Sequence, residues 1–244
     1  MADAASLVIE HLSYRYREGV LALDDVCLSI PAGECVAVIG PNGAGKSTLL
    51  LHLNGLLRGG GRVSVDGVEL RRDTLASIRR LVGLVFQDPD DQLFLPTCLE
   101  DVAFGPLNEG ATWPEAEERA MEALTAVGMD QHAGRPPHQL SVGQRKRVAL
   151  ATVLSMRPSL IAFDEPSAGL DPAARRQFIT IVRGLPQTRI IATHDLALAE
   201  ETCARTVLMD DGRVIADGPT STILRDTPLL LQHRLEPPGY RPPS

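Results

Sequence analysis

A glycine-rich segment carries the clearest chemical signal in the sequence. Residues 40–48 read GPNGAGKST, which fits the pattern G-x-x-x-x-G-K-[ST] between an apolar strand and a helix. In such a loop, backbone N–H groups turn toward phosphates, Lys46 adds a positive charge and Ser47 can ligate Mg²⁺. The alternative is a glycine-rich turn that matches by chance, with odds of about one in a hundred in a chain of this length at average residue usage.

A pair of carboxylates at the end of an apolar strand is the second signal. Residues 160–165 read LIAFDE. Because ligands of a parallel sheet bind at the carboxyl ends of its strands, Asp164 is predicted to reach a Mg²⁺ shell through water. Glu165 is then predicted to face an attacking water. The alternative is a strand that simply ends in a polar turn, which the phosphate loop makes the weaker explanation.

The start of an amphipathic helix is a third candidate. Residues 140–154 read LSVGQRKRVALATVL, with a Ser-x-Gly turn followed by cations in the first two turns. Ser141, the Gly143 amide and the helix N-terminus could together bind a second anion. Serine at such a position is usually an N-cap, so the sequence physics leaves both interpretations open.

The elements around these motifs alternate in a way that predicts an α/β fold with a parallel sheet. Period-two or continuous apolar runs predict strands, and a helical pattern dominates from about 88 to 157, which indicates an inserted helical subdomain. The predicted strands lie at 7–14, 26–30, 35–39, 62–66, 160–163, 189–193, 206–209 and 213–217, and the predicted helices at 45–55, 114–128, 141–156, 172–185 and 196–204.

Composition excludes several classes of protein. The 244 residues include 24 Lys plus Arg and 31 Asp plus Glu, a formal net charge of -7, which argues against a broad nucleic-acid surface. No run approaches the ~18 apolar residues of a membrane span and no signal-peptide core is present, so a soluble, cytosolic chain is expected unless a partner holds it at a membrane. Neither a disulfide framework nor a metal-ligand cluster is predicted, because the cysteines and histidines are scattered: Cys27, Cys35, Cys98, Cys203, His132 and His138.

The order of the motifs resembles the ATP-binding-cassette ATPases. The phosphate loop is followed by Gln87, LSVGQ at 140–144, LIAFDE at 160–165, SAGLD at 167–171 and His194. The resemblance covers roughly residues 6–226. It implies a P-loop core with a parallel sheet, an antiparallel β subdomain and an inserted helical signature subdomain.

The resemblance also implies ATP and Mg²⁺ as ligands and assigns roles to residues. Glu165, His194 and Gln87 are the implied catalytic group, in which His194 holds the γ-phosphate and Gln87 senses it. Tyr16 resembles the aromatic that stacks on adenine, with Tyr14 as its competitor. Asp171 would contact the partner cassette. The implied Mg²⁺ ligands are Ser47, Gln87 and Asp164, and the other implied nucleotide contacts are Asn42, Gly43, Ala44, Gly45, Lys46, Thr48, Ser141, Gly143 and Gln144.

One residue departs from the family pattern. Val142 stands where the family most often has glycine. A β-branched residue is costly where φ is positive, so either the turn avoids that conformation or the signature is weakened.

The implied domain organisation is one ATPase domain at 1–226 and a tail. Its core spans 1–87 and 158–226, with the helical subdomain at about 88–157. The Pro-rich tail at 227–244 is predicted to be loosely ordered.

The segment after Gln87 narrows the resemblance to the ATPases of energy-coupling-factor importers, in particular those for cobalt and nickel. It reads QDPDDQLFLPTCLEDVAFGPLN. An acidic turn and an apolar knob suit docking onto the cytosolic helices of a membrane partner. The alternative is a solvated loop whose apolar residues lie in the core. The acidic residues are Asp88, Asp90 and Asp91, and the apolar ones Leu93, Phe94 and Leu95.

The resemblance thus implies an ATPase that powers such an importer, most closely one for cobalt, with nickel, biotin or another vitamin as alternatives. The implied partners are a second copy of the chain, a transmembrane coupling protein and a substrate-binding membrane component, with no nucleic acid. The implied location is the cytoplasmic face of the membrane. A soluble cassette ATPase of DNA repair usually has a long heptad insertion, yet only about ninety residues separate Lys46 from Ser141. A P-loop kinase would not need LSVGQ.

Overall fold

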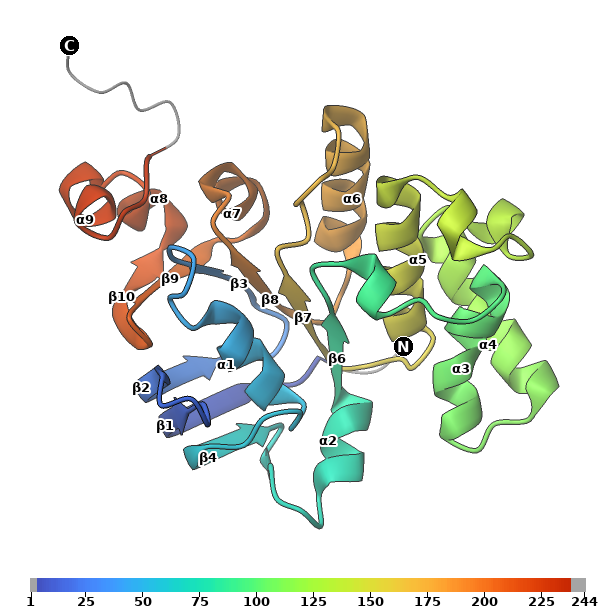
Figure 1. Cartoon of the computed structure of the whole chain (residues 1–244), viewed down its shortest axis with the longest axis horizontal. Helices are drawn as coiled ribbons and strands as arrows, with labels where there is room; N and C mark the ends of the chain where they lie inside the picture. The colour runs from blue at the N-terminus through green and yellow to red at the C-terminus, as the bar shows by residue number, and fades with distance from the viewer. Residues whose placement is uncertain (1–3, 238–244) are drawn as a thin grey trace.

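The computed structural model describes residues 4–237, which form two sheets and the helices packed on them (Figure 1). The smaller sheet is antiparallel, with the strand order β2-β1-β4-β5. Its strands read as short runs with buried residues at alternate positions, as expected for a sheet that packs on one face. They are β1 (Leu7–Arg15), β2 (Leu21–Ile30), β4 (Gly60–Val65) and β5 (Val68–Glu69).

The larger sheet has six strands in the order β10-β9-β3-β8-β7-β6, and every neighbouring pair is parallel except β10 and β9. The predicted α/β class with a parallel sheet is therefore confirmed. The strands are β3 (Cys35–Ile39), β6 (Val82–Val85), β7 (Leu160–Asp164), β8 (Thr188–Thr193), β9 (Arg205–Asp210) and β10 (Arg213–Pro219).

Strand β3 lies between two hydrophobic cores. Val36 and Val38 pack into the core shared with the antiparallel sheet, and Ala37 and Ile39 into the core under the helices. All four side chains are fully buried, which explains why this strand reads as a continuous apolar run. The strand ends at Ile39, directly before the glycine-rich loop.

The helices form two groups. Helices α3 to α5 pack on one another and lie together on the right of Figure 1, beside β6. The other helices flank the two sheets. The helices are α1 (Lys46–Leu53), α2 (Leu75–Leu81), α3 (Cys98–Asn108), α4 (Trp113–Ala126), α5 (Val142–Leu154), α6 (Pro172–Gly184), α7 (Leu196–Thr202), α8 (Thr220–Ile223) and α9 (Thr227–Gln232), with 3₁₀ turns η1 (Pro89–Asp91), η2 (Asp130–His132) and η3 (Pro137–Gln139).

The C-terminal segment is more ordered than predicted. The prediction of a loose tail is wrong for its first part, where α9 buries Leu230 completely and the chain then buries Leu235. In the sequence, Pro228 argues against a helix because proline breaks helices. In the structure it lies in the first turn of α9, where proline is favourable, and Asp226 caps that turn. Residues 238–244 of the predicted tail lie outside the described residues. The division into a core and a helical subdomain stays a prediction.

None of the helices in the described residues can span a membrane. Within residues 4–237, no helix has both the length and the apolar composition needed to cross a bilayer.

Candidate active site

The glycine-rich loop joins β3 to α1 at the carboxyl edge of the larger sheet. Its two ends pass very close to other backbone. A Cβ atom on Gly40 would lie 2.2 Å from the Met209 carbonyl oxygen, and one on Gly45 would lie 2.5 Å from that of Ala22. Gly45, with φ of 99°, precedes the first residue of α1. The predicted order of strand, loop and helix is therefore present, and glycine is required at both ends.

Lys46 is buried inside this loop. Its Nζ donates to the carbonyl oxygens of Gly40 at 2.7 Å and Pro41 at 3.1 Å, and lies 3.8 Å from Glu165 Oε1. Burial lowers the pKa of the ammonium, and the charges of Glu165 and Asp164 oppose that shift. The loop therefore holds a desolvated cation whose positive charge is balanced by two neighbouring carboxylates.

Asp164 and Ser47 meet across the site. Ser47 Oγ donates to Asp164 Oδ1 at 3.0 Å, which joins the start of α1 to the end of β7. Burial raises the pKa of the Asp164 carboxyl, and the hydrogen bond from Ser47 opposes the rise. A hydroxyl and a carboxylate at this separation form an all-oxygen donor set, which fits Mg²⁺.

Glu165 is held rigidly at the end of β7. Its Oε2 accepts from Thr193 Oγ1 at 2.9 Å, while its Oε1 accepts from the backbone N–H and the Nδ1 of His194 at 2.9 and 2.8 Å. The residue is 7% exposed and has φ of 41°, a left-handed conformation that costs free energy for a non-glycine residue. A carboxylate fixed this way on two strand ends is oriented in advance. Sequence reasoning missed Thr193.

A cavity of about 280 Å³ opens over the loop. Gln87, Glu165 and Tyr16 line it together with the loop. Tyr16 donates to or accepts from Thr48 Oγ1 at 3.1 Å, whereas the partly buried Tyr14 packs against the His52 ring at the margin of the core. The geometry therefore favours Tyr16 over Tyr14 as the aromatic of this cavity. The remaining lining residues are Val20, Leu21, Ala22, Asn42, Gly43, Ala44, Gly45, Lys46, Ser47 and Thr48.

The residues at the start of α5 lie outside this cavity. Ser141 Oγ accepts from Gln144 N at 3.3 Å, and Gln144 Oε1 accepts from Ser141 N at 2.9 Å, so the predicted N-cap is confirmed as a capping box. Val142 is the first helical residue and does not have positive φ, so the turn avoids the conformation that would exclude it. A Cβ atom on Gly143 would lie only 2.8 Å from Ala174 Cβ. Helix α5 therefore packs so closely on α6 that this position favours glycine. The anion-binding role remains a prediction.

Lys146 is a site residue that sequence reasoning missed. It is 3% exposed, and its Nζ donates to the carbonyl oxygens of Glu165 at 3.2 Å and Pro166 at 3.1 Å. Burial lowers its pKa to about 8. The signal was available, because Lys146 and Lys46 are the only lysines of the chain, and Lys146 shares a helix face with the buried Ala149, Leu150 and Val153.

Asp171 serves as the N-cap of α6 in the structure. Its Oδ1 accepts from the backbone N–H groups of Ala173 at 2.8 Å and Ala174 at 2.9 Å. Its predicted contact with a partner cassette remains a prediction.

The apolar residues after Gln87 differ in burial, so they do not form the apolar knob as predicted. Leu93 is 8% exposed and packs into the core of α3 to α5, so its assignment to the knob is wrong. Phe94 is 63% exposed and packs edge-on against the half-exposed Phe104, with ring centroids 5.2 Å apart. In the acidic turn, Asp90 forms an ion pair with Arg145 at 3.0 Å. The exposed apolar surface is therefore Phe94 with Phe104.

Two groups of cysteine and histidine side chains correct the prediction that they are scattered. His11, Asp25 and Cys27 place one potential ligand atom each within 4.8 Å of the others. The Sγ atoms of Cys35 and Cys203 lie 2.9 Å apart, although both are free thiols. Strand pairing and helix packing bring these residues together from distant positions in the sequence.

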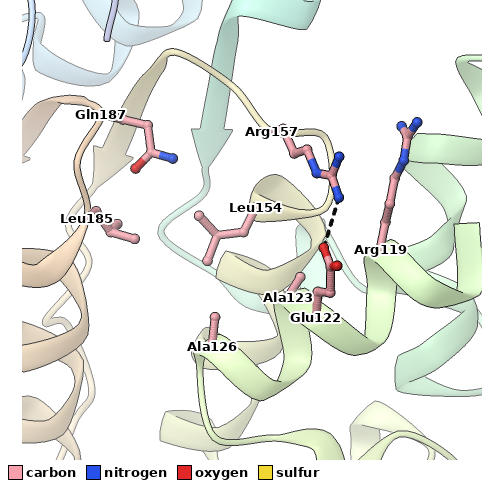
Figure 2. Close-up of a pocket in the computed structure, with 8 residues that line it drawn as sticks. All are labelled: Arg119, Glu122, Ala123, Ala126, Leu154, Arg157, Leu185 and Gln187. Carbon is pink, nitrogen blue, oxygen red and sulfur yellow. Dashed lines mark hydrogen bonds and ion pairs between the residues drawn. The ribbon is translucent and has the colours of Figure 1, made fainter. Parts of the chain in front are cut away.

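A second cavity, of about 390 Å³, lies between α4, the end of α5 and the connection from α6 to β8. Figure 2 shows Leu185 and Gln187 on one wall and residues of α4 on the other, with Arg157 paired to Glu122. The distance from Arg157 Nη2 to Glu122 Oε2 is 2.9 Å. None of the predicted site residues lines this cavity.

Comparisons with known proteins identify relatives over nearly the whole chain. The family model described as ABC transporter matches residues 23–168. An ABC transporter ATP-binding protein of Streptomyces coelicolor is 52% identical over 98% of this chain and 93% of its own. The cobalt import ATP-binding protein CbiO of Rhodobacter capsulatus is 48% identical, over 95% of this chain and 85% of its own. The energy-coupling factor transporter ATP-binding protein EcfA of Methanothermobacter thermautotrophicus is 46% identical, over 94% and 76%.

Solved structures agree with the fold. The structure of cbiO1 from Clostridium perfringens, part of the transporter complex cbiONQ, superposes with a TM-score of 0.81 at 37% identity and covers 93% of each chain. The cassette MJ0796, solved as a dimer in a post-hydrolysis state with ADP and phosphate, gives a TM-score of 0.79 at 31% identity, over 88% of this chain and 98% of its own.

Proposed function

Because the chain belongs to the ABC transporter ATP-binding family, we propose that it is the ATPase subunit of an energy-coupling-factor importer, most closely one for cobalt ions. The chain is an ATPase that hydrolyses ATP to ADP and phosphate, and this hydrolysis is coupled to transport. The convergence of Lys46, Ser47, Asp164 and Glu165 at the carboxyl edge of one sheet supports ATP hydrolysis, and the names of the relatives support the importer and its cargo.

The residues of this edge divide the work of phosphoryl transfer. Lys46 and the loop amides bind the β- and γ-phosphates. Ser47, Asp164 and Gln87 would hold Mg²⁺, which would supply positive charge against that of the phosphates. Glu165 orients the attacking water and takes its proton. The hydrogen bonds from Thr193 and His194 fix the direction in which Glu165 points. Positioning and charge stabilisation then supply most of the rate enhancement.

His194 and the aromatic wall complete the nucleotide site in this proposal. The His194 ring is 58% exposed while its Nδ1 contacts Glu165, so its Nε2 is available to the γ-phosphate. Tyr16 stacks on adenine, and the exposed Val20 beside it adds apolar surface to the rim. Sequence reasoning missed Val20.

We propose that two copies of the chain pair head to tail, so that Ser141 of one closes on ATP bound to the other. The exposure of Ser141 outside its own cavity supports this, as do the dimers formed by the related cassette MJ0796. The further partners are a transmembrane coupling protein and a substrate-binding membrane component, which hold the chain at the cytoplasmic face. The name of the Rhodobacter relative supports cobalt as cargo, with nickel or a vitamin as alternatives.

The test replaces the base while preserving its contacts. In Glu165→Gln the side-chain oxygen can still accept both His194 bonds, so ATP should bind while hydrolysis drops by ~10² or more. Lys46→Ala should instead weaken nucleotide binding. Glu122→Gln, an exposed change on α4, is the matched control and should leave the rate unchanged. Hydrolysis by Glu165→Gln at the wild-type rate would remove Glu165 from the mechanism. The membrane proteins that co-purify with the chain identify the cargo.

A further inference from the structure

Two irregularities in the pairing of β1 with β2 bring unusual side chains together. Between the pairs Ile9↔Leu28 and Leu12↔Val26, two residues of β1 oppose one of β2, and the next shift places the extra residue on β2. His11, with φ of 52°, lies in the first bulge, and Asp25, with φ of 56°, lies in the second. Bulges re-aim side chains, and these two aim His11 and Asp25 toward each other.

Cys27 supplies a third donor at the same place. His11 Nδ1 lies 2.8 Å from Asp25 Oδ1 and 3.8 Å from Cys27 Sγ. The arrangement is braced by backbone contacts, because Asp25 N donates to Ser13 Oγ at 2.9 Å and His11 N donates to Cys27 Sγ at 3.3 Å. The three side chains are exposed, so a solvated ion can reach them without any opening of the fold.

We propose that His11, Asp25 and Cys27 bind a late first-row divalent cation, of which Zn²⁺ and Co²⁺ are examples. Metal–nitrogen and metal–sulfur bonds of about 2.0 and 2.3 Å in a tetrahedral site place the two ligand atoms about 3.6 Å apart, close to the separation of His11 Nδ1 and Cys27 Sγ. The separation of 2.8 Å between His11 Nδ1 and Asp25 Oδ1 would have to lengthen by a fraction of an ångström. The fourth position falls to water.

The donor set distinguishes this site from the proposed magnesium site. Imidazole and thiolate favour Zn²⁺, Co²⁺ and Ni²⁺, whereas Ser47 and Asp164 offer only oxygen, which suits Mg²⁺. The alternative is a simple ion pair between His11 and Asp25. That alternative gives the Cys27 side chain no ligand role. Neither His11 nor Cys27 lines the nucleotide cavity, so binding at this site is independent of the proposed catalysis.

The experiment titrates Co²⁺ into the untagged, full-length chain without nucleotide. A bound thiolate gives a sulfur-to-cobalt charge-transfer absorption in the near ultraviolet, which an all-oxygen site cannot produce. We expect this band to saturate at one equivalent, to disappear in Cys27→Ser, and to need at least tenfold more Co²⁺ in His11→Asn and Asp25→Asn. Asparagine is chosen because it tolerates the left-handed backbone of both positions. His138→Asn, another exposed histidine, is the control and should titrate as wild type.

A second measurement needs no variant. Zn²⁺ should protect Cys27 of the wild-type chain from alkylation by at least tenfold in rate, as measured by peptide mass spectrometry. Absence of the charge-transfer band, its survival in Cys27→Ser, or equal alkylation of Cys27 with and without Zn²⁺ would each overturn the proposal. ATPase activity enters neither measurement, so failure here leaves the proposed function untouched.

Discussion

Replacement of Lys146 by methionine should change how the stability of the fold depends on pH. Methionine keeps much of the length of the side chain and removes its charge. Burial lowers the pKa of Lys146 from 10.5 to about 8, and each pKa unit corresponds to about 1.4 kcal/mol. Keeping this ammonium charged inside the fold therefore costs roughly 3 kcal/mol, a net value in which the charges of Asp88, Glu165 and Asp164 already oppose the effect of burial.

The sign of the effect follows from proton counting. Between pH values of about 8 and 10.5 the unfolded chain holds a proton on Lys146 that the folded chain has lost. The free energy of unfolding therefore rises with pH in that window, and below about pH 8 the full penalty is present. From about pH 7 to about pH 9.5 the wild type should gain about 2 kcal/mol relative to Lys146→Met.

Urea unfolding of both proteins at several pH values measures this difference directly. The other titratable groups are present in both proteins, so their contributions largely cancel. Arg79→Met removes an exposed arginine on α2 and should run parallel to wild type. Curves for wild type and Lys146→Met that stay parallel across the window would refute a desolvated ammonium at this position.

Three further predictions concern surfaces and thiols. Ser141→Arg should abolish the dimerisation that Mg-ATP induces in a hydrolysis-deficient background, because the added bulk would face the phosphates of the partner; light scattering measures this, and an undiminished dimer would refute the proposed interface. Phe94→Ser should leave the ATPase rate of the isolated chain intact but release it from the membrane complex, and equal loss of both would mean that the ring is structural. Hydrogen peroxide should oxidise Cys35 and Cys203 to a disulfide with release of water, which lowers the number of free thiols from four to two. The disulfide should raise the Tm by about 10 °C. Four free thiols after treatment would contradict this prediction.

Motifs that are continuous in sequence could be predicted well. The phosphate loop and the two carboxylates each sit between an apolar strand and a helix or turn, so their position at one sheet edge follows from local pattern. The α/β class follows in the same way from alternating strand and helix signals. The resemblance to a family then assigns roles to further residues of the site. Local pattern alone leaves those roles open.

Other features depend on packing that local pattern does not encode. The bond from Lys146 to the backbone of Glu165 requires α5 to lie against the end of β7. Leu93 and Phe94 are neighbours of opposite burial in a segment without regular periodicity, so the pattern could not separate them. The cluster around His11 depends on two bulges, and a bulge changes the register without a clear signal in the residues.

The place of β3 between two cores has a consequence for local unfolding. The amides of Val36 to Ile39 are bonded to strands on both sides and covered on both faces, so their protons can exchange with solvent only when the fold opens as a whole. We expect the exposed surface around Phe94 to open at a lower free energy, because its ring is 63% exposed. The phosphate loop is thus anchored to the part of the molecule that opens last, while the surfaces proposed to meet partners belong to parts that open first. Fluctuations needed for docking can therefore occur without loosening the loop that holds the phosphates.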